Sequence, residues 1–332
     1  MKIGAIGAGS WGTTLADLLA RNDNSVTLWA YEKDLVERMS RTRENDLYLP
    51  GITLAENLAF TADLAEAVEG CDLLVLVPPS QVMGDVLRRA ASHIAGGTLV
   101  VSASKGIEND TLRTMSEVLE EVLPPETAGR AVFLSGPSFA REVAAGMPTA
   151  VVAASRMGEA AREVQEVFST RSFRVYTNDD VVGVELGGAL KNVIALAAGV
   201  SDGLGFGYNT RAALITRGLA EISRMGLALG ANPATFSGLA GMGDLVLTCT
   251  GDLSRNRTVG MELGRGKSLQ EVLAGMKMVA EGVKTTLSAY QLAGKLKVEV
   301  PITEQMYRIL YEGKDPRQAV TDLMLRELKA EA

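Results

Sequence analysis

One lysine stands alone in a long, weakly polar stretch of the sequence. Lys191 is the only charged residue between Glu185 and Asp202. A lysine in a partly dry site has a lowered pKa and can exchange a proton with a substrate hydroxyl near neutral pH. Alternatively, its aliphatic stem covers apolar surface while its ammonium group reaches solvent. Lys191 is therefore the candidate acid/base, with a solvent-exposed lysine as the other interpretation.

A second group of polar residues offers hydrogen-bond donors to an anion. Ser254, Arg255 and Asn256 follow one another after a glycine-containing turn. Their hydroxyl, guanidinium and amide groups are the kind that a phosphate needs, although Ser254 could equally cap a solvated helix. Lys105 and the segment 135–140 follow apolar runs and are further ligand candidates, with ordinary turns as the alternative.

Three glycines near the start of the chain form a recognisable motif. Gly7, Gly9 and Gly12 fit G-x-G-x-x-G between an apolar run and a helical pattern. In that context the glycines allow a tight turn, the close approach of a pyrophosphate and close packing of helix on strand. The motif predicts binding of a dinucleotide such as NAD(P)H, with an ordinary glycine-rich turn as the alternative.

The sequence after the second expected strand does not select one coenzyme. NAD enzymes commonly place an acidic residue at this point, where it binds the ribose diol. Here the second strand should end near Ala30, which is not acidic, and Glu32 comes slightly late and is followed by Lys33. The pattern indicates neither clean NAD selection nor an arginine pocket for a 2′-phosphate, and the segment 31–34 could merely begin a solvated helix.

The surrounding pattern predicts the elements that position these residues. Strands are expected at 2–6, 26–29, 73–77, 98–102, 132–134 and 149–154, with helical segments between them. This alternation predicts an α/β doubly wound, largely parallel sheet, with ligands at the carboxyl ends of its strands. From about residue 177 the pattern becomes helical, and the run 186–201 reads as a buried helix. We expect one domain over residues 1–180 and an all-α domain over 181–332.

Composition excludes several classes of function. The net charge of −7 and the pI near 5.1 argue against a broad basic face for nucleic acid or anionic membrane. Two cysteines and one histidine are too few for a disulfide framework, a metal cluster or a histidine-based triad. No signal-peptide pattern opens the chain, and the long apolar run is short for a bilayer. We therefore expect a cytoplasmic protein without a metal and without stable membrane insertion.

Taken together, these motifs resemble one family, the bacterial-type NAD(P)-dependent glycerol-3-phosphate dehydrogenases. The resemblance covers essentially the whole chain, through the segments 7–12, 104–106, 135–140, 190–192, 241–244, 254–256 and 279–282. It implies a Rossmann-type domain followed by a helical domain like that of 6-phosphogluconate dehydrogenase. It also implies interconversion of dihydroxyacetone phosphate and sn-glycerol 3-phosphate with NAD(P)H, supplying glycerophospholipid synthesis.

The resemblance also implies roles for individual residues. Lys191 would be the proton acceptor in alcohol oxidation and the donor in ketone reduction. The residues expected around the substrate are Lys105, Gly136, Ser138, Lys191, Asp244, Ser254, Arg255 and Asn256. Those expected around the cofactor are Gly7, Gly9, Ser10, Trp11, Gly12, Tyr31, Glu32, Lys105, Ala140, Arg255, Val279 and Glu281. The family often has Arg or His at the end of the second strand, so Tyr31 and Glu32 weaken a claim of NADPH preference.

Three other functions remain open from the sequence. A dehydrogenase of the same layout could act on a 3-hydroxy acid or a sugar acid, in which case the segment 254–256 would not bind phosphate. A non-catalytic dinucleotide sensor would keep the glycine motif without turnover. The helical half could also mediate assembly, because small residues such as Gly187, Gly188, Ala195 and Ala198 suit a subunit interface as well as an interdomain one. A homodimer is compatible with catalysis.

Overall fold

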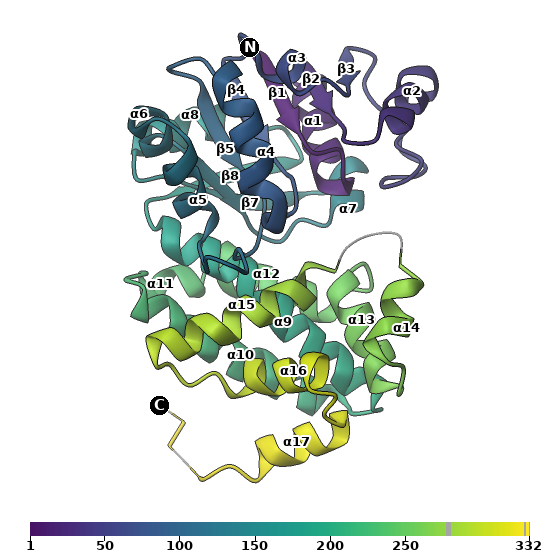
Figure 1. Cartoon of the computed structure of the whole chain (residues 1–332), viewed down its shortest axis with the longest axis vertical. Coiled ribbons are helices and arrows are strands. Elements are labelled where there is room, and N and C mark those ends of the chain that lie inside the picture. Colours follow the sequence, from purple (N-terminus) through teal and green to yellow (C-terminus); the bar gives the residue numbers. More distant parts are fainter. Residues whose placement is uncertain (277–279, 329, 332) are drawn as a thin grey trace.

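The chain folds into a sheet-containing domain followed by a helical domain (Figure 1). The structure is a computed structural model, and it describes residues 1–276, 280–328, 330 and 331. The last strand ends at Asn178 and the first helix of the second domain begins at Val181. The polypeptide therefore passes from one domain to the other over a very short connection.

The first domain is built on an eight-stranded sheet with the order β3-β2-β1-β4-β5-β6-β7-β8. Its strands are β1 (Lys2–Ile6), β2 (Ser25–Trp29), β3 (Leu58–Thr61), β4 (Leu73–Leu76), β5 (Leu99–Ser102), β6 (Val132–Ser135), β7 (Thr149–Ala154) and β8 (Phe173–Asn178). All neighbouring pairs are parallel except β6 with β7. The strand order reverses between β1 and β4, which is the point where doubly wound sheets bind ligands.

Helices cover both faces of this sheet, because successive side chains of a buried strand point to opposite sides. In β4, Leu73 and Val75 join one apolar cluster, while Leu74 and Leu76 join another. The covering helices are α1 (Ser10–Arg21), α2 (Lys33–Thr42), α3 (Leu64–Val68), α4 (Met83–Ala90), α5 (Met115–Val122), α6 (Pro125–Gly129), α7 (Ala140–Ala144) and α8 (Gly158–Phe168). The result is the Rossmann-type arrangement expected from the sequence.

The second domain surrounds one long helix, α9 (Val181–Gly203). Its other helices are α10 (Tyr208–Ala228), α11 (Pro233–Phe236), the π-helical turn η3 (Leu239–Gly243), α12 (Asp244–Thr250), α13 (Arg255–Gly264), α14 (Leu269–Ala274), α15 (Glu281–Leu296), α16 (Pro301–Tyr311) and α17 (Pro316–Met324). By length and composition α9 could cross a membrane, but 89% of its most apolar window is buried inside the protein. It is therefore the core helix of this domain, as Figure 1 shows.

Helices α9 and α13 touch through their backbones. A Cβ atom on Gly199 would lie 2.0 Å from the carbonyl oxygen of Arg257, and one on Gly260 would lie 2.0 Å from that of Leu196. Real side chains cannot approach so closely, so glycine is required at both positions. This contact brings the start of α13 beside the C-terminal half of α9.

The first turns of α9 also belong to the core of the sheet domain. Val181 and Val184 join the apolar cluster that includes Phe133. The next residue, Glu185, accepts hydrogen bonds from the backbone nitrogen and the hydroxyl of Ser116, at 2.8 and 2.6 Å. Helix α9 is thus fixed to the sheet domain at one end and to the helical domain along the rest of its length.

The expected strands are all present, and two further strands were not expected. Both β3 and β8 lie at the edges of the sheet, where each has only one neighbouring strand. Two of the four residues of β3 are not buried, and exposed residues alternate with buried ones in the first half of β8. Half-exposed edge strands have a weaker apolar pattern than the central strands, which explains why they were missed.

Candidate active site

Two lysines and one aspartate meet where the domains join. The Lys191 ammonium on α9 binds Oδ1 of Asp244, the first residue of α12. Lys105, which follows β5 in the other domain, donates to Oδ2 of the same carboxylate at 2.8 Å. Lys191 is only 7% exposed and Asp244 only 1%. The solvent-exposed interpretation of Lys191 is therefore wrong, because the side chain lies in a dry site.

Burial and charge set the protonation of this cluster. Burial lowers the pKa of Lys191 to about 8, with Lys105 acting in the same direction and Asp244 opposing both. Burial by itself would raise the pKa of Asp244, but the ammonium groups of Lys105 and Lys191 outweigh it and hold that pKa below its ordinary value. A lysine with a pKa near 8 can give or take a proton under physiological conditions.

Neighbouring groups orient the two charged side chains. Lys105 also donates to the carbonyl oxygen of Gly136 at 3.2 Å, and the Ser138 hydroxyl donates to the same oxygen at 3.0 Å. Thr248, one turn after Asp244 on α12, lies within 3.3 Å of Oδ1 of that carboxylate. The structure therefore brings Lys105, Gly136, Ser138, Lys191 and Asp244 together, as expected.

The start of α13 approaches the same region from the side. Asn256 donates to the Asn192 side chain at 2.9 Å and accepts from the backbone nitrogen of Gly282, also at 2.9 Å. Since Asn192 is the residue after Lys191, the first turn of α13 is tied directly to the helix that carries the lysine. Ser254 caps α13 by accepting from the backbone nitrogen of Arg257 at 3.3 Å. Ser254 is thus a helix cap, but the helix that it caps packs against α9 and is not solvated all round.

Arg255 and Glu281 differ in exposure, and the charge of Arg255 acts on the pKa of Glu281. Arg255 is exposed, whereas Asn256 beside it is buried. Burial raises the pKa of Glu281, and Arg255, Lys191 and Lys105 each oppose that shift. These charges place Glu281 within the electrostatic field of the lysine cluster. Val279, another expected cofactor contact, lies outside the described residues.

The glycine motif forms the turn between β1 and α1. Gly7 has a φ of +109°, in the region that favours glycine, and a Cβ on Gly12 would lie 1.8 Å from the Gly7 carbonyl oxygen. A Cβ on Gly9 would meet nothing within 4 Å, so that side of the turn is open. Gly9 precedes Ser10, the first residue of α1, and the open helix N-terminus suits a pyrophosphate.

Other expected cofactor residues border this turn. The Trp11 indole nitrogen is buried without a hydrogen-bond partner among the described residues. The Ala140 carbonyl oxygen, at the start of α7, accepts from the Thr14 hydroxyl of α1 at 3.2 Å. An open helix N-terminus and an unpaired buried donor are features that fit a dinucleotide.

At the end of β2, Tyr31 and Glu32 behave differently. Tyr31 is 76% exposed, whereas Glu32 accepts a hydrogen bond from the Tyr48 hydroxyl at 2.8 Å. Helix α2 begins at Lys33, so the segment 31–34 leads into a helix, and this does not decide between a helix start alone and a cofactor contact.

Three residues that hold candidate site residues in place were not identified from the sequence. They are Asn192, Thr248 and Tyr48. Thr248 lies four residues after Asp244, a helical spacing that could have indicated the contact. Asn192 adjoins the candidate lysine. Tyr48 has no comparable signal, because its partner Glu32 belongs to a different element.

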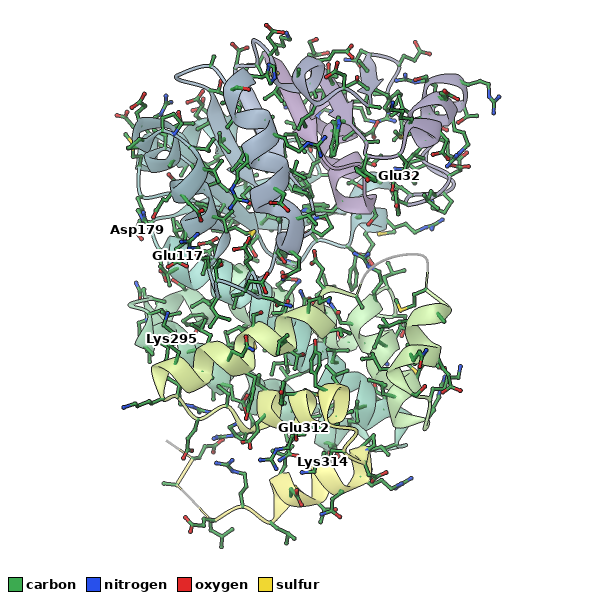
Figure 2. All side chains as sticks on the ribbon, in the orientation of Figure 1. Glu32, Glu117, Asp179, Lys295, Glu312 and Lys314 are labelled. Atoms are coloured by element: carbon green, nitrogen blue, oxygen red, sulfur yellow. The ribbon has the colours of Figure 1, made fainter. Side chains whose placement is uncertain are left out.

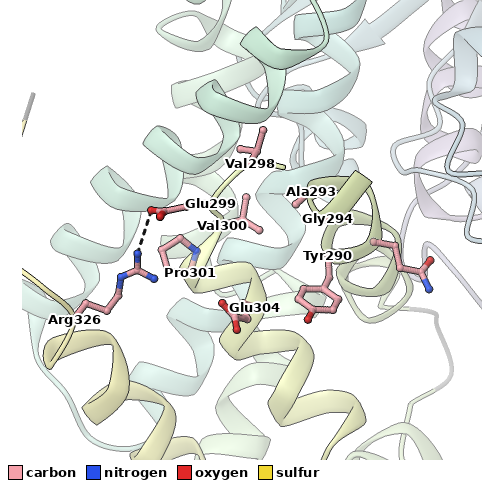
Figure 3. A pocket seen from close by; sticks show the side chains of 10 residues that line it. Tyr290, Ala293, Gly294, Val298, Glu299, Val300, Pro301, Glu304 and Arg326 are labelled. Atoms are coloured by element: carbon pink, nitrogen blue, oxygen red, sulfur yellow. Dashed lines mark hydrogen bonds and ion pairs between the residues drawn. The ribbon is translucent and has the colours of Figure 1, made fainter. Parts of the chain in front are cut away.

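A cavity of about 430 Å³ lies elsewhere, in the helical domain between α15 and α16 (Figure 3). Its lining includes Tyr290, Glu304 and Arg326, and Arg326 pairs with Glu299 at 3.3 Å. None of the lining residues belongs to the lysine cluster or to the glycine turn. The candidate site therefore rests on the charged cluster, and within the described residues no group of His, Cys, Asp and Glu suits a metal ion.

A Rossmann-type domain with an open glycine turn, joined to a helical domain that supplies a buried lysine, defines a two-domain NAD(P)-dependent dehydrogenase. Family models described as the N-terminus and the C-terminus of NAD-dependent glycerol-3-phosphate dehydrogenase match residues 2–161 and 180–321. The chain belongs to this family, and its helical domain is of the 6-phosphogluconate dehydrogenase type.

Individual relatives agree with this assignment. The chain is 68% identical over 331 residues to "Glycerol-3-phosphate dehydrogenase [NAD(P)+]" of Syntrophotalea carbinolica, covering 100% of this chain and 99% of the relative. It is 66% identical over 330 residues to the protein of the same name from Geobacter sulfurreducens, covering 99% and 98%. Among solved structures, glycerol-3-phosphate dehydrogenase from Coxiella burnetii superposes with a TM-score of 0.93 at 42% identity, covering 98% of this chain and 99% of that one.

Proposed function

We propose that this chain interconverts dihydroxyacetone phosphate and sn-glycerol 3-phosphate with NAD(P)H. In the reducing direction, the ketone carbon receives a hydride and its oxygen receives a proton, while NAD(P)H becomes NAD(P)+. The observation that carries the proposal is the Lys191–Asp244–Lys105 cluster, which combines a lysine of pKa about 8 with a second cation at the junction of the domains.

Lys191 exchanges the proton in this scheme. Its ammonium form donates to the oxygen of the reduced ketone, and its neutral amine accepts the proton when the alcohol is oxidised. Asp244 holds the Lys191 nitrogen in place, and Lys105 adds a second positive charge where negative charge develops on the substrate oxygen. Gly136 and Ser138 lie beside Lys105 and would contact the carbon chain and hydroxyl groups of the substrate.

The first turn of α13 binds the substrate phosphate. Ser254, Arg255 and Asn256 provide a hydroxyl, an exposed guanidinium and a buried amide at a helix N-terminus, which favours an anion. The hydrogen bond from Asn256 to Asn192 supports the required proximity, because it links this turn to the residue beside Lys191. A phosphate here and a carbonyl at Lys191 would be the two ends of one small substrate.

The glycine turn holds the coenzyme pyrophosphate, with Gly7, Gly9, Ser10, Trp11 and Gly12 around it. When bound, the nicotinamide supplies or accepts the hydride. Further contacts are proposed for Tyr31, Glu32, Lys105, Ala140, Arg255, Val279 and Glu281. Arg255 would then face both ligands, which agrees with its electrostatic influence on Glu281.

The cellular setting follows from the same chemistry. We place the division between coenzyme and substrate domains at residues 180 and 181, since the last strand ends at Asn178 and α9 begins at Val181. The product sn-glycerol 3-phosphate would supply glycerophospholipid synthesis in the cytoplasm. A homodimer is compatible with this role, and the acidic chain offers no broad surface for nucleic acid.

The proposal is tested by following NADH and, separately, NADPH at 340 nm with dihydroxyacetone phosphate, using unphosphorylated dihydroxyacetone as the control. We expect turnover that depends on the phosphate. Turnover with a 3-hydroxy acid or a sugar acid instead would assign the chain to the rival dehydrogenase class. Binding of coenzyme without turnover of any of these substrates would identify a dinucleotide sensor.

A further inference from the structure

Glu32 lies beside the glycine turn because of the pairing of β1 with β2. The last pair of the two strands joins Ile6 to Trp29, and the backbone nitrogen of Gly7 donates to the Trp29 carbonyl oxygen at 3.1 Å. Glu32 follows β2 by three residues and precedes α2, and Figure 2 shows it in the sheet domain. In a Rossmann-type domain the ribose next to the adenine lies at this end of the second strand.

Tyr48 fixes the Glu32 carboxylate in this position. The Tyr48 hydroxyl donates to Oε1 of Glu32 at 2.8 Å. Burial, together with Glu32, raises the pKa of Tyr48 to about 12, so the phenol remains a donor throughout the physiological range. Oε2 has no hydrogen-bond partner within the part of the chain that the structure describes, and it is available to a ribose hydroxyl.

The segment that carries Tyr48 is itself anchored to the glycine turn. Asn45 accepts from the backbone nitrogen of Tyr48 at 2.9 Å and donates to the Ala8 carbonyl oxygen at 2.8 Å. Asn45 is fully buried. The distance from the carboxylate to the pyrophosphate turn is therefore set by a short chain of hydrogen bonds rather than by a free side chain.

The nearby arginine of α2 is already neutralised. Arg38 binds two carboxylates, those of Asp34 and Asp46, with an Nε to Oδ1 distance of 3.1 Å for Asp46. Lys33 is an exposed cation at the start of α2, and Tyr31 is exposed and uncharged. A 2′-phosphate would thus meet the Glu32 carboxylate, and Arg38 could bind it only by giving up its own partners.

We infer that Glu32, held by Tyr48, makes this chain select NADH over NADPH. The carboxylate accepts hydrogen bonds from the ribose diol of NADH and repels the 2′-phosphate of NADPH. This inference rests on the proposed function, because it assumes that the glycine turn binds a nicotinamide dinucleotide.

The test is direct binding of each coenzyme without substrate, followed by quenching of intrinsic tryptophan fluorescence. We expect a dissociation constant for NADH that is lower than that for NADPH by about tenfold or more. Glu32→Gln should tighten NADPH binding by about tenfold, because it removes the repulsion. Tyr48→Phe should reduce the preference by weakening NADH binding. Glu37→Gln, which removes an exposed carboxylate from α2, the helix that follows Glu32, should leave the preference unchanged.

Equal affinity for the two coenzymes would overturn the inference and leave the proposed function intact. So would an unchanged preference in Glu32→Gln, or an equal loss of preference in Glu37→Gln, which would indicate general charge rather than a specific contact. Failure of both coenzymes to bind would overturn the inference and the proposed function together.

Discussion

Asp244 accepts a hydrogen bond from Lys105 at 2.8 Å, although the two residues belong to different domains. The other oxygen of the same carboxylate binds Lys191. One buried anion therefore keeps two cations close together at the domain junction, where each would otherwise repel the other. The protonation of Lys191 thus depends on the position of both domains.

Lys191→Ala should reduce kcat by about a thousandfold, because it removes the group that we propose to exchange the substrate proton. The dissociation constants of the coenzymes should remain within about twofold of the wild type, since the glycine turn is untouched. Steady-state kinetics and coenzyme titration check both parts. Lys295→Ala, at an exposed lysine on α15, serves as the control. Near-normal turnover in Lys191→Ala would rule out this acid/base.

The pH dependence of turnover should show the titration of Lys191 near its pKa of about 8. Ketone reduction uses the ammonium form, so kcat/KM should fall as the pH rises through 8. Alcohol oxidation uses the neutral amine, so it should rise over the same range. Asp244→Asn should shift the pH profiles of both reactions to lower pH, because the variant loses the negative charge that raises the Lys191 pKa. Unshifted pH profiles would contradict this electrostatic coupling between Asp244 and Lys191.

Arg255→Ala should raise the KM for dihydroxyacetone phosphate by about 10- to 100-fold, because a charge-assisted contact with the phosphate is lost. The activity on unphosphorylated dihydroxyacetone should be unchanged at saturating coenzyme, a condition that is needed because Arg255 is also a proposed cofactor contact. Arg265→Ala, at the far end of α13, is the matched control. An unaltered KM in Arg255→Ala would mean that the phosphate binds at another place.

Glu221→Gln should gain stability relative to the wild type as the pH rises. Glu221 accepts hydrogen bonds from the backbone nitrogens of Ile302 and Thr303, and burial raises its pKa to about 7. The native state therefore binds more protons than the unfolded state between about pH 4.5 and 7, and the wild type loses stability as the pH rises through that window.

Glutamine does not ionise, so the difference in free energy of unfolding, variant minus wild type, should increase by on the order of 2 kcal/mol from pH 4.5 to 8. Urea unfolding at both pH values measures it. Glu312→Gln, at an exposed site labelled in Figure 2, should show little change. A constant difference across pH for Glu221→Gln would show that the carboxylate does not titrate in this window.

Gly199→Ala should lower the free energy of unfolding by about 1–3 kcal/mol and reduce kcat, because the new methyl group would meet the Arg257 carbonyl oxygen. Gly207→Ala is the control, since a Cβ there meets nothing within 4 Å. Thermal unfolding and kinetics on both variants make the comparison. Equal stability of the two variants would show that α9 and α13 can move apart at little cost.

Much of the fold could be predicted because its central strands are buried on both faces and read as short apolar runs. The edge strands β3 and β8 could not, since each has one neighbour and a weaker pattern. The helical character of the second domain and the burial of α9 followed from its apolar composition. The glycine turn could be predicted because the spacing of Gly7, Gly9 and Gly12 follows from the tight turn and the close helix–strand contact that these positions need.

The candidate site was only partly readable from the residues. Lys191 could be identified as a lone charge, but whether it was buried depended on partners far away in the sequence. The link between Asp244 and Lys105 crosses 139 positions, and no local spacing predicts it. The same holds for Glu32 and Tyr48, whose contact depends on where the segment after α2 returns to the sheet. Family resemblance supplied Asp244, whereas the structure supplied Tyr48.

In the proposed function, the backbone contact between Gly199 of α9 and Arg257 of α13 sets the length of substrate that fits. Lys191 and Arg255 are carried by these two helices, so the proposed span from carbonyl to phosphate is determined by helices that already touch. No smaller residue exists to bring them closer, and a larger one would push them apart. Engineering this protein to accept longer phosphorylated ketones would therefore require a change in the angle between α9 and α13. Shortening side chains of the site would leave the distance between Lys191 and Arg255 unchanged.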